Sequence, residues 1–229
     1  MGRSKNGVSG LVSCFAVSPS PLLKELYAVG TYSGHVAAYS SDNRVVFKAK
    51  AQASGVTQIR YSSCGTFLWA GGRRSRELLC WDLRAGDSKE PYWRVPRECR
   101  TNAHIQFDLI NFDESLQGPL VLSGSTEERG LTCYALKGGQ AERVEMGGME
   151  ELTGAHSMVN GVSLNPWNRQ LAVSTGHRSS PQCKALMLVD EDEDQEDVKE
   201  SPEERTVGLY VYGSDVEGES VHEEGSSSS

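Results

Sequence analysis

Short strands in repeated units, with no stretch of helical periodicity, predict that this 229-residue chain is an all-β protein. Two landmarks recur along it. The first, an apolar–x–x–aromatic pattern, ends at Tyr39, Trp81, Tyr134 and Tyr212. The second, an apolar pair followed by small residues, ends at Gly30, Gly71, Gly124 and Thr175. The first step is 42 residues in one series and 41 in the other, and later steps are longer. Two landmarks in similar register indicate a true repeat.

The clearest copy of the repeat is Glu77-Leu-Leu-Cys-Trp-Asp-Leu-Arg84. A Trp-Asp pair, here Trp81-Asp82, at the end of a short strand is typical of a WD40 propeller blade, whose period is about 40–45 residues. The longer steps between later copies indicate loop insertions. The sequence therefore predicts a WD40 β-propeller with about four blades, the last one incomplete. We interpret it as the C-terminal part of a larger propeller, with a four-bladed ring as the alternative.

Turn residues divide each unit into expected strands. In the first unit these span residues 12–17, 26–30, 36–39 and 45–48. The second unit gives 57–61, 67–71, 78–81 and 92–95, and the third gives 105–109, 120–124, 131–134 and 141–146. The fourth unit gives only three, at 161–164, 171–175 and 207–212. Residues 1–9 offer no strand that could supply the missing one.

The expected organisation follows from these strands. Blades occupy about 10–50, 54–98, 101–146 and 157–213, after a tail at 1–9 and before an acidic, serine-rich tail at 214–229. An acidic insertion at about 179–205 interrupts the last blade and is expected to be disordered. Residues 190–229 hold two basic and 15 acidic residues, although the whole chain has a formal charge of −8. The repeat body is therefore mildly basic. The insertion is either a solvated loop or a competitor for an anionic ligand.

Several classes of function have little support in the sequence. Nothing resembles a signal peptide or a membrane span. The six cysteines include no Cys-x-x-Cys pair, and Cys80 and Cys133 share one repeat position, which favours small apolar packing over disulfides or zinc. The five histidines are scattered, and no nucleophile motif is present. We therefore expect no enzyme activity, metal, cofactor or small-molecule substrate.

One propeller face carries the candidate ligand-binding residues. The loop after the second strand of a blade and the loop leading into the next blade open on the same face. The candidates from these loops are Tyr32, Lys48, Lys50, Arg73, Arg74, Arg76, Arg97 and Arg100. Guanidinium groups bind phosphates and stack on bases, and aromatic rings offer platforms for unpaired bases. This pattern is consistent with single-stranded RNA, but solvated arginines paired with Glu77 and Glu98 are the alternative.

Longer runs of sequence resemble one family. They are Gly65-Thr-Phe-Leu-Trp-Ala-Gly-Gly-Arg-Arg-Ser-Arg-Glu-Leu-Leu-Cys-Trp-Asp-Leu-Arg84, Thr101-Asn-Ala-His-Ile-Gln-Phe-Asp-Leu109, Leu122-Ser-Gly-Ser-Thr126 and Asn160-Gly-Val-Ser-Leu-Asn-Pro166. They are similar to the telomerase Cajal body protein family, over roughly residues 10–176 and more weakly over 207–212.

The resemblance implies a seven-bladed WD40 scaffold in the nucleus and its Cajal bodies. Such a protein would bind the Cajal body box of small Cajal body RNAs and of telomerase RNA, alongside H/ACA ribonucleoprotein and telomerase proteins. It would assist telomerase assembly and delivery to telomeres. Within the matching motif, the RNA-facing role falls on Arg73, Arg74 and Arg76. The competing hypothesis is a WD40 platform for protein–protein interaction with no RNA role.

Overall fold

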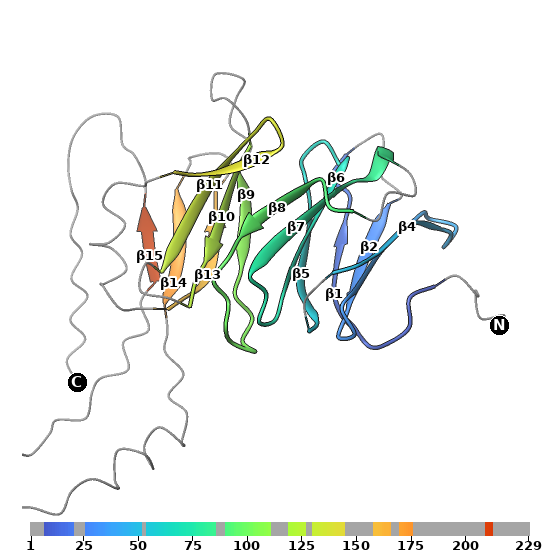
Figure 1. The fold of residues 1–229 in the computed structure, drawn as a ribbon, viewed down its shortest axis with the longest axis horizontal. Coiled ribbons are helices and arrows are strands. Elements are labelled where there is room, and N and C mark those ends of the chain that lie inside the picture. Colours follow the sequence, from blue (N-terminus) through green and yellow to red (C-terminus); the bar gives the residue numbers. More distant parts are fainter. Residues whose placement is uncertain are drawn as a thin grey trace, which may run out of the picture.

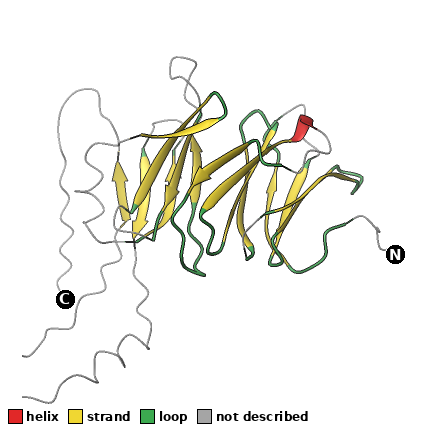
Figure 2. Ribbon diagram, viewed as in Figure 1, coloured by secondary structure: helices red, strands yellow, loops and turns green. Residues whose placement is uncertain are grey.

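The computed structural model describes residues 7–20, 26–51, 54–85, 90–110, 119–126, 130–144, 158–165, 170–175 and 209–212. Within these ranges the chain is almost entirely strand and loop, and the helical element is a short 3-10 turn, η2 (Leu83–Ala85) (Figure 2). No helix in the described ranges is long and apolar enough to cross a membrane. The expected acidic insertion and the 214–229 tail lie outside the described residues.

Four antiparallel sheets stand side by side in chain order (Figure 1). Sheet 1 contains β1 (Val12–Val17), β2 (Tyr27–Thr31), β3 (His35–Tyr39) and β4 (Val45–Lys50). Sheet 2 contains β5 (Val56–Tyr61), β6 (Phe67–Gly72), β7 (Glu77–Asp82) and β8 (Trp93–Pro96). Sheet 3 contains β9 (Phe107–Ile110), β10 (Leu120–Gly124), β11 (Leu131–Lys137) and β12 (Gln140–Val144). Sheet 4 contains β13 (Val159–Leu164), β14 (Leu171–Thr175) and β15 (Leu209–Tyr212). Three four-stranded units and a three-stranded one were the expectation, and the described residues confirm it.

Most strands begin and end within two residues of the expected positions. Strand β9 is an informative exception. It was expected to start at residue 105 and starts at Phe107. The backbone carbonyl of Ile105 instead accepts a hydrogen bond from the guanidinium of Arg97. The amide of Gln106 donates to the Asn160 carbonyl of sheet 4, at 2.9 Å. These two residues therefore connect neighbouring sheets instead of extending β9.

The register of the sheets places equivalent residues on equivalent faces. We call the side of each sheet that points to the previous sheet in the chain its preceding face. In sheet 2 this face carries Ile59, Tyr61, Leu68, Ala70, Leu79 and Trp81, paired across three strands. In sheet 1 the same positions hold Phe15, Val17, Tyr27, Val29, Ala37 and Tyr39. The repeat seen in the sequence is thus a repeat of one packing surface.

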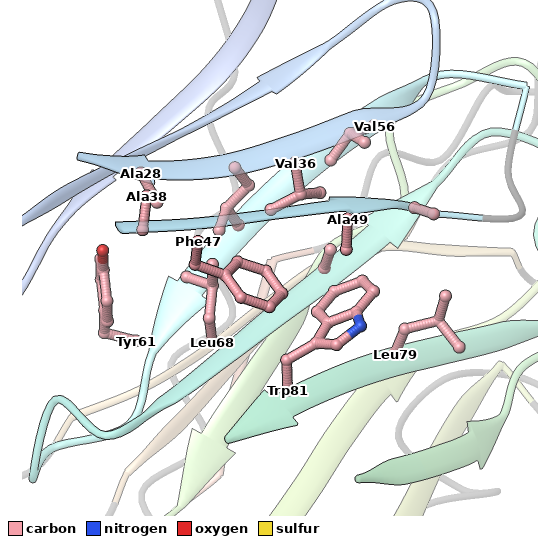
Figure 3. Close-up of a cluster of buried hydrophobic side chains, with 13 residues drawn as sticks. Ala28, Val36, Ala38, Phe47, Ala49, Val56, Tyr61, Leu68, Leu79 and Trp81 are labelled. Carbon is pink, nitrogen blue, oxygen red and sulfur yellow. The ribbon is translucent and has the colours of Figure 1, made fainter. Parts of the chain in front are cut away.

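Hydrophobic residues pack between the sheets, since each sheet covers the preceding face of the next. Trp81 is 1% exposed and lies in the cluster between sheets 1 and 2, with its ring 5.9 Å from that of Phe47 (Figure 3). Tyr134 occupies the same position in the cluster between sheets 2 and 3. Cys80 and Cys133 are buried free thiols, as expected from their repeat position. A third cluster joins sheets 3 and 4.

Sheet 1 differs from the others because its preceding face has no sheet against it in the described residues. Phe15 is 74% exposed and Val17 is 60% exposed. Tyr39 is partly covered, since its ring stacks on Tyr27 at 5.2 Å and its hydroxyl accepts a hydrogen bond from the Val8 amide. Tyr212, the fourth member of the aromatic series, pairs with Leu171 in sheet 4. The apolar surface of β1 is therefore open.

The glycines of the second landmark mark places where two sheets touch closely. A Cβ built on Gly30 would come within 2.7 Å of the Val56 side chain. One on Gly71 would meet the Arg97 guanidinium at 2.5 Å. One on Gly124 would lie inside contact distance of the Val159 backbone. Each glycine thus allows the second strand of its sheet to lie close to a later segment of the chain: β5, the β8–β9 connection or β13.

Polar contacts join the first strands of successive sheets. Ser13 Oγ donates to the Val56 carbonyl at 2.5 Å. The Gln58 side chain bonds both the amide and the carbonyl of Phe107, each at 2.9 Å. The chain of contacts continues through Asp108, a buried residue whose carboxylate pairs with the Arg60 guanidinium and accepts the Leu164 amide at 2.9 Å. These contacts fix the sheets relative to one another and so position the loops at their ends.

Candidate nucleic-acid interface

Backbone hydrogen bonds bring four connections together at one end of sheets 1 and 2. The Ala51 amide donates to the Gly34 carbonyl at 2.8 Å. The Arg73 amide donates to the Gly55 carbonyl at 2.9 Å. Two further bonds, Arg74 N to Thr101 O at 3.1 Å and Arg97 N to Arg76 O at 2.7 Å, add the connection from β8 to β9. We call residues 32–34, 51, 54–55, 73–76 and 97–104 the loop face. The loops that the sequence predicted to share a face do lie together.

Tyr32 and Arg73 form the best-defined pair on the loop face. The guanidinium carbon of Arg73 lies 4.7 Å from the centre of the Tyr32 ring, in a cation–π arrangement. Tyr32 is 46% exposed. The pair joins the β2–β3 turn of sheet 1 to the β6–β7 loop of sheet 2. Sequence reasoning selected both residues but could not show that they are in contact.

Arg74 and Arg76 are exposed on the same loop. Arg74 has a φ of 49°, in the left-handed region that L-residues other than glycine avoid at a cost of about 1–2 kcal/mol. Its amide is held by Thr101. Within the described ranges neither side chain forms an ion pair, so both can reach an anionic ligand.

Arg97 was expected to contact a ligand, and the structure corrects this. The residue is only 2% exposed, and one terminal nitrogen donates to the Ile105 carbonyl. Its Nε and Nη1 atoms are buried without a hydrogen-bond partner in the described structure. Burial lowers the pKa of this guanidinium, since the charged form loses hydration. Arg97 supports the connection to β9 from within instead of presenting its charge at the surface.

Lys48 and Lys50 were expected in the loop that leads to sheet 2, and this placement is also wrong. Both lie in β4, which runs two residues further than expected. The alternation of β4 buries Phe47 and Ala49 against sheet 2, so the two lysines point to the open side of sheet 1. Lys48 Nζ donates to the Gly7 carbonyl at 3.3 Å. Lys50 pairs with His35 near the loop end of the strand, so it lies closer to the loop face than Lys48.

Arg100 extends the loop face toward sheet 3. It is exposed, and its amide donates to Thr126 Oγ1 at 3.2 Å. Thr126 in turn bonds the Glu98 carbonyl through its own amide at 2.9 Å. Because Thr126 belongs to the turn that follows β10, the basic residues of sheet 2 are continuous with a loop of sheet 3.

The arginines of sheet 2 and its loops fall into two groups, those that form ion pairs and those that do not. Glu77, a suggested partner for the loop arginines, pairs instead with Arg94 of β8 at 3.2 Å. Arg94 also contacts Glu90 at 3.4 Å. Arg73, Arg74 and Arg76 take part in no ion pair of the described residues. The loop face is therefore basic without local neutralisation from Glu77.

His104 lies on the loop face and was not selected from the sequence. Partial burial, followed by the nearby positive charge of Arg97, lowers its pKa below the ordinary histidine range. Both effects favour the neutral form of the imidazole. No sequence signal marks His104, because its relation to Arg97 arises only when the β8–β9 connection folds.

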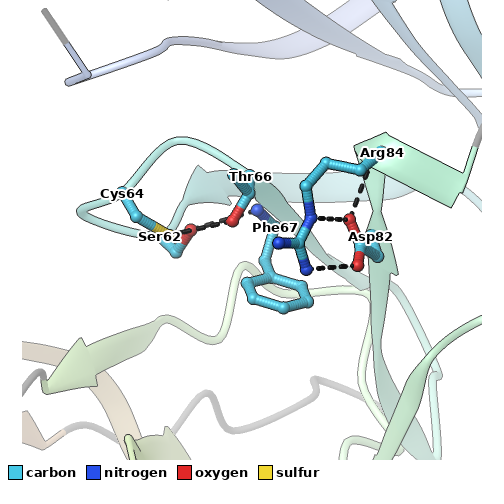
Figure 4. Close-up of polar contacts among 6 residues, drawn as sticks. All are labelled: Ser62, Cys64, Thr66, Phe67, Asp82 and Arg84. Atoms are coloured by element: carbon cyan, nitrogen blue, oxygen red, sulfur yellow. Dashed lines mark hydrogen bonds and ion pairs between the residues drawn. The ribbon is translucent and has the colours of Figure 1, made fainter. Parts of the chain in front are cut away.

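A different polar cluster occupies the opposite end of sheet 2 (Figure 4). The Asp82 carboxylate accepts bonds from the Arg84 amide, Nε and Nη2 at 2.7–2.9 Å, and the side-chain bond lowers the pKa of Asp82. Beside it, the exposed Cys64 thiol contacts Ser62 Oγ and Thr66 Oγ1. Partial burial opposes ionisation of Cys64, but these hydrogen bonds outweigh it and lower the pKa of the thiol. The three bonds from Arg84 to Asp82 fix the turn that follows β7.

No group of three or more His, Cys, Asp or Glu side chains in the described ranges is arranged to hold a metal ion. Besides the Glu98 carboxylate, the loop face offers guanidinium, phenol, imidazole, hydroxyl and backbone amide groups. These groups recognise anions and planar rings by charge, hydrogen bonding and stacking. Such a surface suits binding.

Comparison with known proteins gives related sequences. No protein-family model matches the chain. Human telomerase Cajal body protein 1 is 32% identical over 179 residues, covering 78% of this chain and 30% of that protein. The protein of the same name from Mesocricetus auratus is 32% identical over the same share of this chain. Guanine nucleotide-binding protein negative regulator 1 of Schizosaccharomyces pombe is 29% identical over 175 residues. The chain spans about a third of the length of the telomerase Cajal body proteins it matches.

Solved structures agree on the fold. The β-propeller domain of Myceliophteria thermophila Cps50 (Swd1) superposes with a TM-score of 0.53 at 14% identity, covering 76% of this chain and 53% of that one. A chain of the mitotic checkpoint complex superposes with a TM-score of 0.51 at 16% identity. At such low identity these similarities concern the fold alone. The four sheets are blades of a WD40 β-propeller, as the repeat predicted.

Proposed function

From its sequence relationship to telomerase Cajal body protein 1 and its WD40 blades, we propose that this chain is a non-catalytic RNA-binding scaffold. Its ligands are the Cajal body box of small Cajal body RNAs and of telomerase RNA. It directs these RNAs to Cajal bodies in the nucleus and supports telomerase assembly and transport to telomeres. H/ACA ribonucleoprotein and telomerase proteins are its protein partners.

One observation carries the RNA-binding part of this proposal. Arg73, Arg74 and Arg76 gather on one loop without an acidic partner in the described residues, and Tyr32 lies beside them. Arginine and an exposed aromatic ring are the groups that bind phosphates and unpaired bases. The mildly basic charge of the repeat body supports the same conclusion.

We further propose that the chain supplies blades to a larger propeller. The support is the open preceding face of sheet 1, where apolar side chains are exposed at positions that are buried in sheet 2. Another sheet packed against β1 would bury Phe15 and Val17 as sheet 1 buries Ile59 and Tyr61. A seven-bladed ring would satisfy this requirement.

Binding of labelled hairpin RNAs at several salt concentrations tests the RNA proposal. We expect the Cajal body box loop to bind more tightly than a scrambled loop, with affinity falling steeply as salt rises. Removing one phosphate contact should reduce the log–log salt slope by about 0.7. Arg74→Gln and Arg76→Gln should each do so. Arg94→Gln is the matched control, because the charge of Arg94 is already paired with Glu77 and Glu90. Equal affinity for both loops would disprove sequence-specific RNA binding.

A protein-interaction platform remains the second proposed function, and a different surface favours it. Tyr92, which is 54% exposed, packs with Phe67 and Trp93 near the end of sheet 2 that carries Arg84. Aromatic residues and arginine are enriched in protein interfaces. Partner capture that survives nuclease treatment and is lost in Tyr92→Ala would support this function. Capture that depends on RNA would support the first one.

A further inference from the structure

The contact between Tyr32 and Arg73 is held in place by the backbone on both sides. The Tyr32 amide donates to the Leu11 carbonyl at 3.0 Å, and the Arg73 amide donates to Gly55 at 2.9 Å. Ser54 Oγ adds a bond to the Arg73 carbonyl at 3.2 Å. The pair is therefore ordered before any ligand binds, which reduces the entropy lost on binding.

The Tyr32 ring is only partly covered. The Arg73 guanidinium lies over one face, and nearly half of the Tyr32 surface remains exposed. The Arg73 Nε atom is buried without a hydrogen-bond partner in the described residues, and the residue as a whole is half-buried. A planar group can therefore stack on the tyrosine while an anionic group meets the outer edge of the guanidinium. A nucleotide contains both groups at adjacent positions.

We propose that the Tyr32–Arg73 pair receives one unpaired base of a single-stranded RNA, with the base on Tyr32 and the neighbouring phosphate on Arg73. This inference rests on the proposed RNA-binding function and specifies the form of RNA that the loop face takes. In a duplex, neighbouring base pairs cover both faces of every internal base, so Tyr32 cannot stack on it. The pair consequently selects a loop or another unpaired segment over a helix.

The geometry also distinguishes RNA from an acidic peptide. A carboxylate-rich peptide would satisfy the arginine charges but would leave the exposed tyrosine ring without a stacking partner. Base–aromatic stacking contributes on the order of tenfold to a hundredfold in affinity for each base. The ring should therefore matter as much as the charge, and this difference can be measured.

Fluorescence anisotropy with two RNAs tests the proposal. One RNA is a hairpin with the Cajal body box in its loop, and the other has the same strand closed as a perfect duplex. Four variants are compared with the wild type: Tyr32→Phe, Tyr32→Leu, Arg73→Lys and Tyr92→Leu. Thermal melts of each variant identify any that fail to fold.

Tyr32→Phe should bind the hairpin within about twofold of the wild type, because it keeps the ring. Tyr32→Leu should bind about tenfold or more weakly, and Arg73→Lys should be intermediate, since lysine keeps the charge but not the planar group. None of these changes should alter duplex binding, and Tyr92→Leu, an exposed tyrosine away from the loop face, should bind as the wild type does.

Four results would overturn the proposal. If Tyr32→Leu binds the hairpin as tightly as the wild type does, the stacking role is wrong although RNA binding stands. The same conclusion follows if wild type binds duplex and hairpin equally, or if a polyglutamate peptide of equal charge displaces the RNA with equal potency. If wild type binds neither RNA, both this inference and the proposed function fail.

Discussion

The preceding faces of sheets 1 and 2 carry similar residues in the same register but have different surroundings. Ile59 is 4% exposed in sheet 2, whereas Phe15, its counterpart in sheet 1, is 74% exposed. The strands pair equally well in both sheets. Strand formation therefore depends on local pattern, whereas burial depends on whether another sheet is present. One chain thus contains both the covered and the uncovered form of a single surface.

The largest expected effect comes from Trp81→Ala, which removes the largest fully buried side chain of the sheet 1–sheet 2 cluster. We expect the free energy of unfolding to fall by about 3–5 kcal/mol, because a core cavity replaces the indole. Tyr39→Ala is the matched change on the open face and should cost about 1–2 kcal/mol, through loss of the Tyr27 stack. Urea unfolding measures both. Equal losses would mean that the two faces are equally buried.

An intermediate effect is expected from Asp108→Ala. This change leaves Arg60 without its ion-pair partner and the Leu164 amide without an acceptor. Because Asp108 is buried but Arg60 is partly exposed, the expected loss is about 2–4 kcal/mol. Asp42→Ala is the control, since its pair with Arg44 is solvent-exposed. Thermal unfolding measures both losses. If the two changes lower the melting temperature equally, the contacts of Asp108 with Arg60 and Leu164 do not hold the sheets together.

The smallest expected effect is that of Phe15→Thr. Threonine keeps the strand preference, and Phe15 lacks a covering sheet, so stability should change by no more than about 0.5 kcal/mol. The counterpart Ile59→Thr should cost about 2–3 kcal/mol because it buries a hydroxyl and leaves a cavity. Urea unfolding of the two variants sharpens the comparison. A large loss for Phe15→Thr would show that the β1 face is already covered in solution.

Much of the fold could be predicted because the repeat signals are local. Alternating apolar residues, turn residues and the Trp-Asp pair each lie within one unit, and they located the described strands within about two residues, except that β11 runs three residues further than expected. The start of β9 was missed because Ile105 and Gln106 bond to other parts of the array. Such contacts between distant segments leave no periodic trace in the sequence.

The candidate site was harder to predict than the fold. Loop positions correctly grouped Tyr32 with Arg73, Arg74 and Arg76 at one end of the sheets. The same reasoning could not tell that Arg97 turns inward under Gly71, nor that β4 continues to Lys50. Side-chain direction depends on three-dimensional packing around each loop. His104 was missed for the same reason.

The glycines at 30, 71 and 124 have a practical consequence for comparing sequences. Each stands where a single added carbon would collide with the next part of the array. A glycine at this position is therefore a marker of a tight junction between blades, and it can be counted in sequences for which no coordinates exist. In the fourth unit the pairing of Leu171 with Tyr212 places Ser174 at that position, one residue before the Thr175 that the sequence pattern suggested. A blade packed after this unit would have to lie further from it than the other blades lie from one another. Alignments of related chains can therefore be searched for the position at which the glycine is replaced and the distance between neighbouring blades increases.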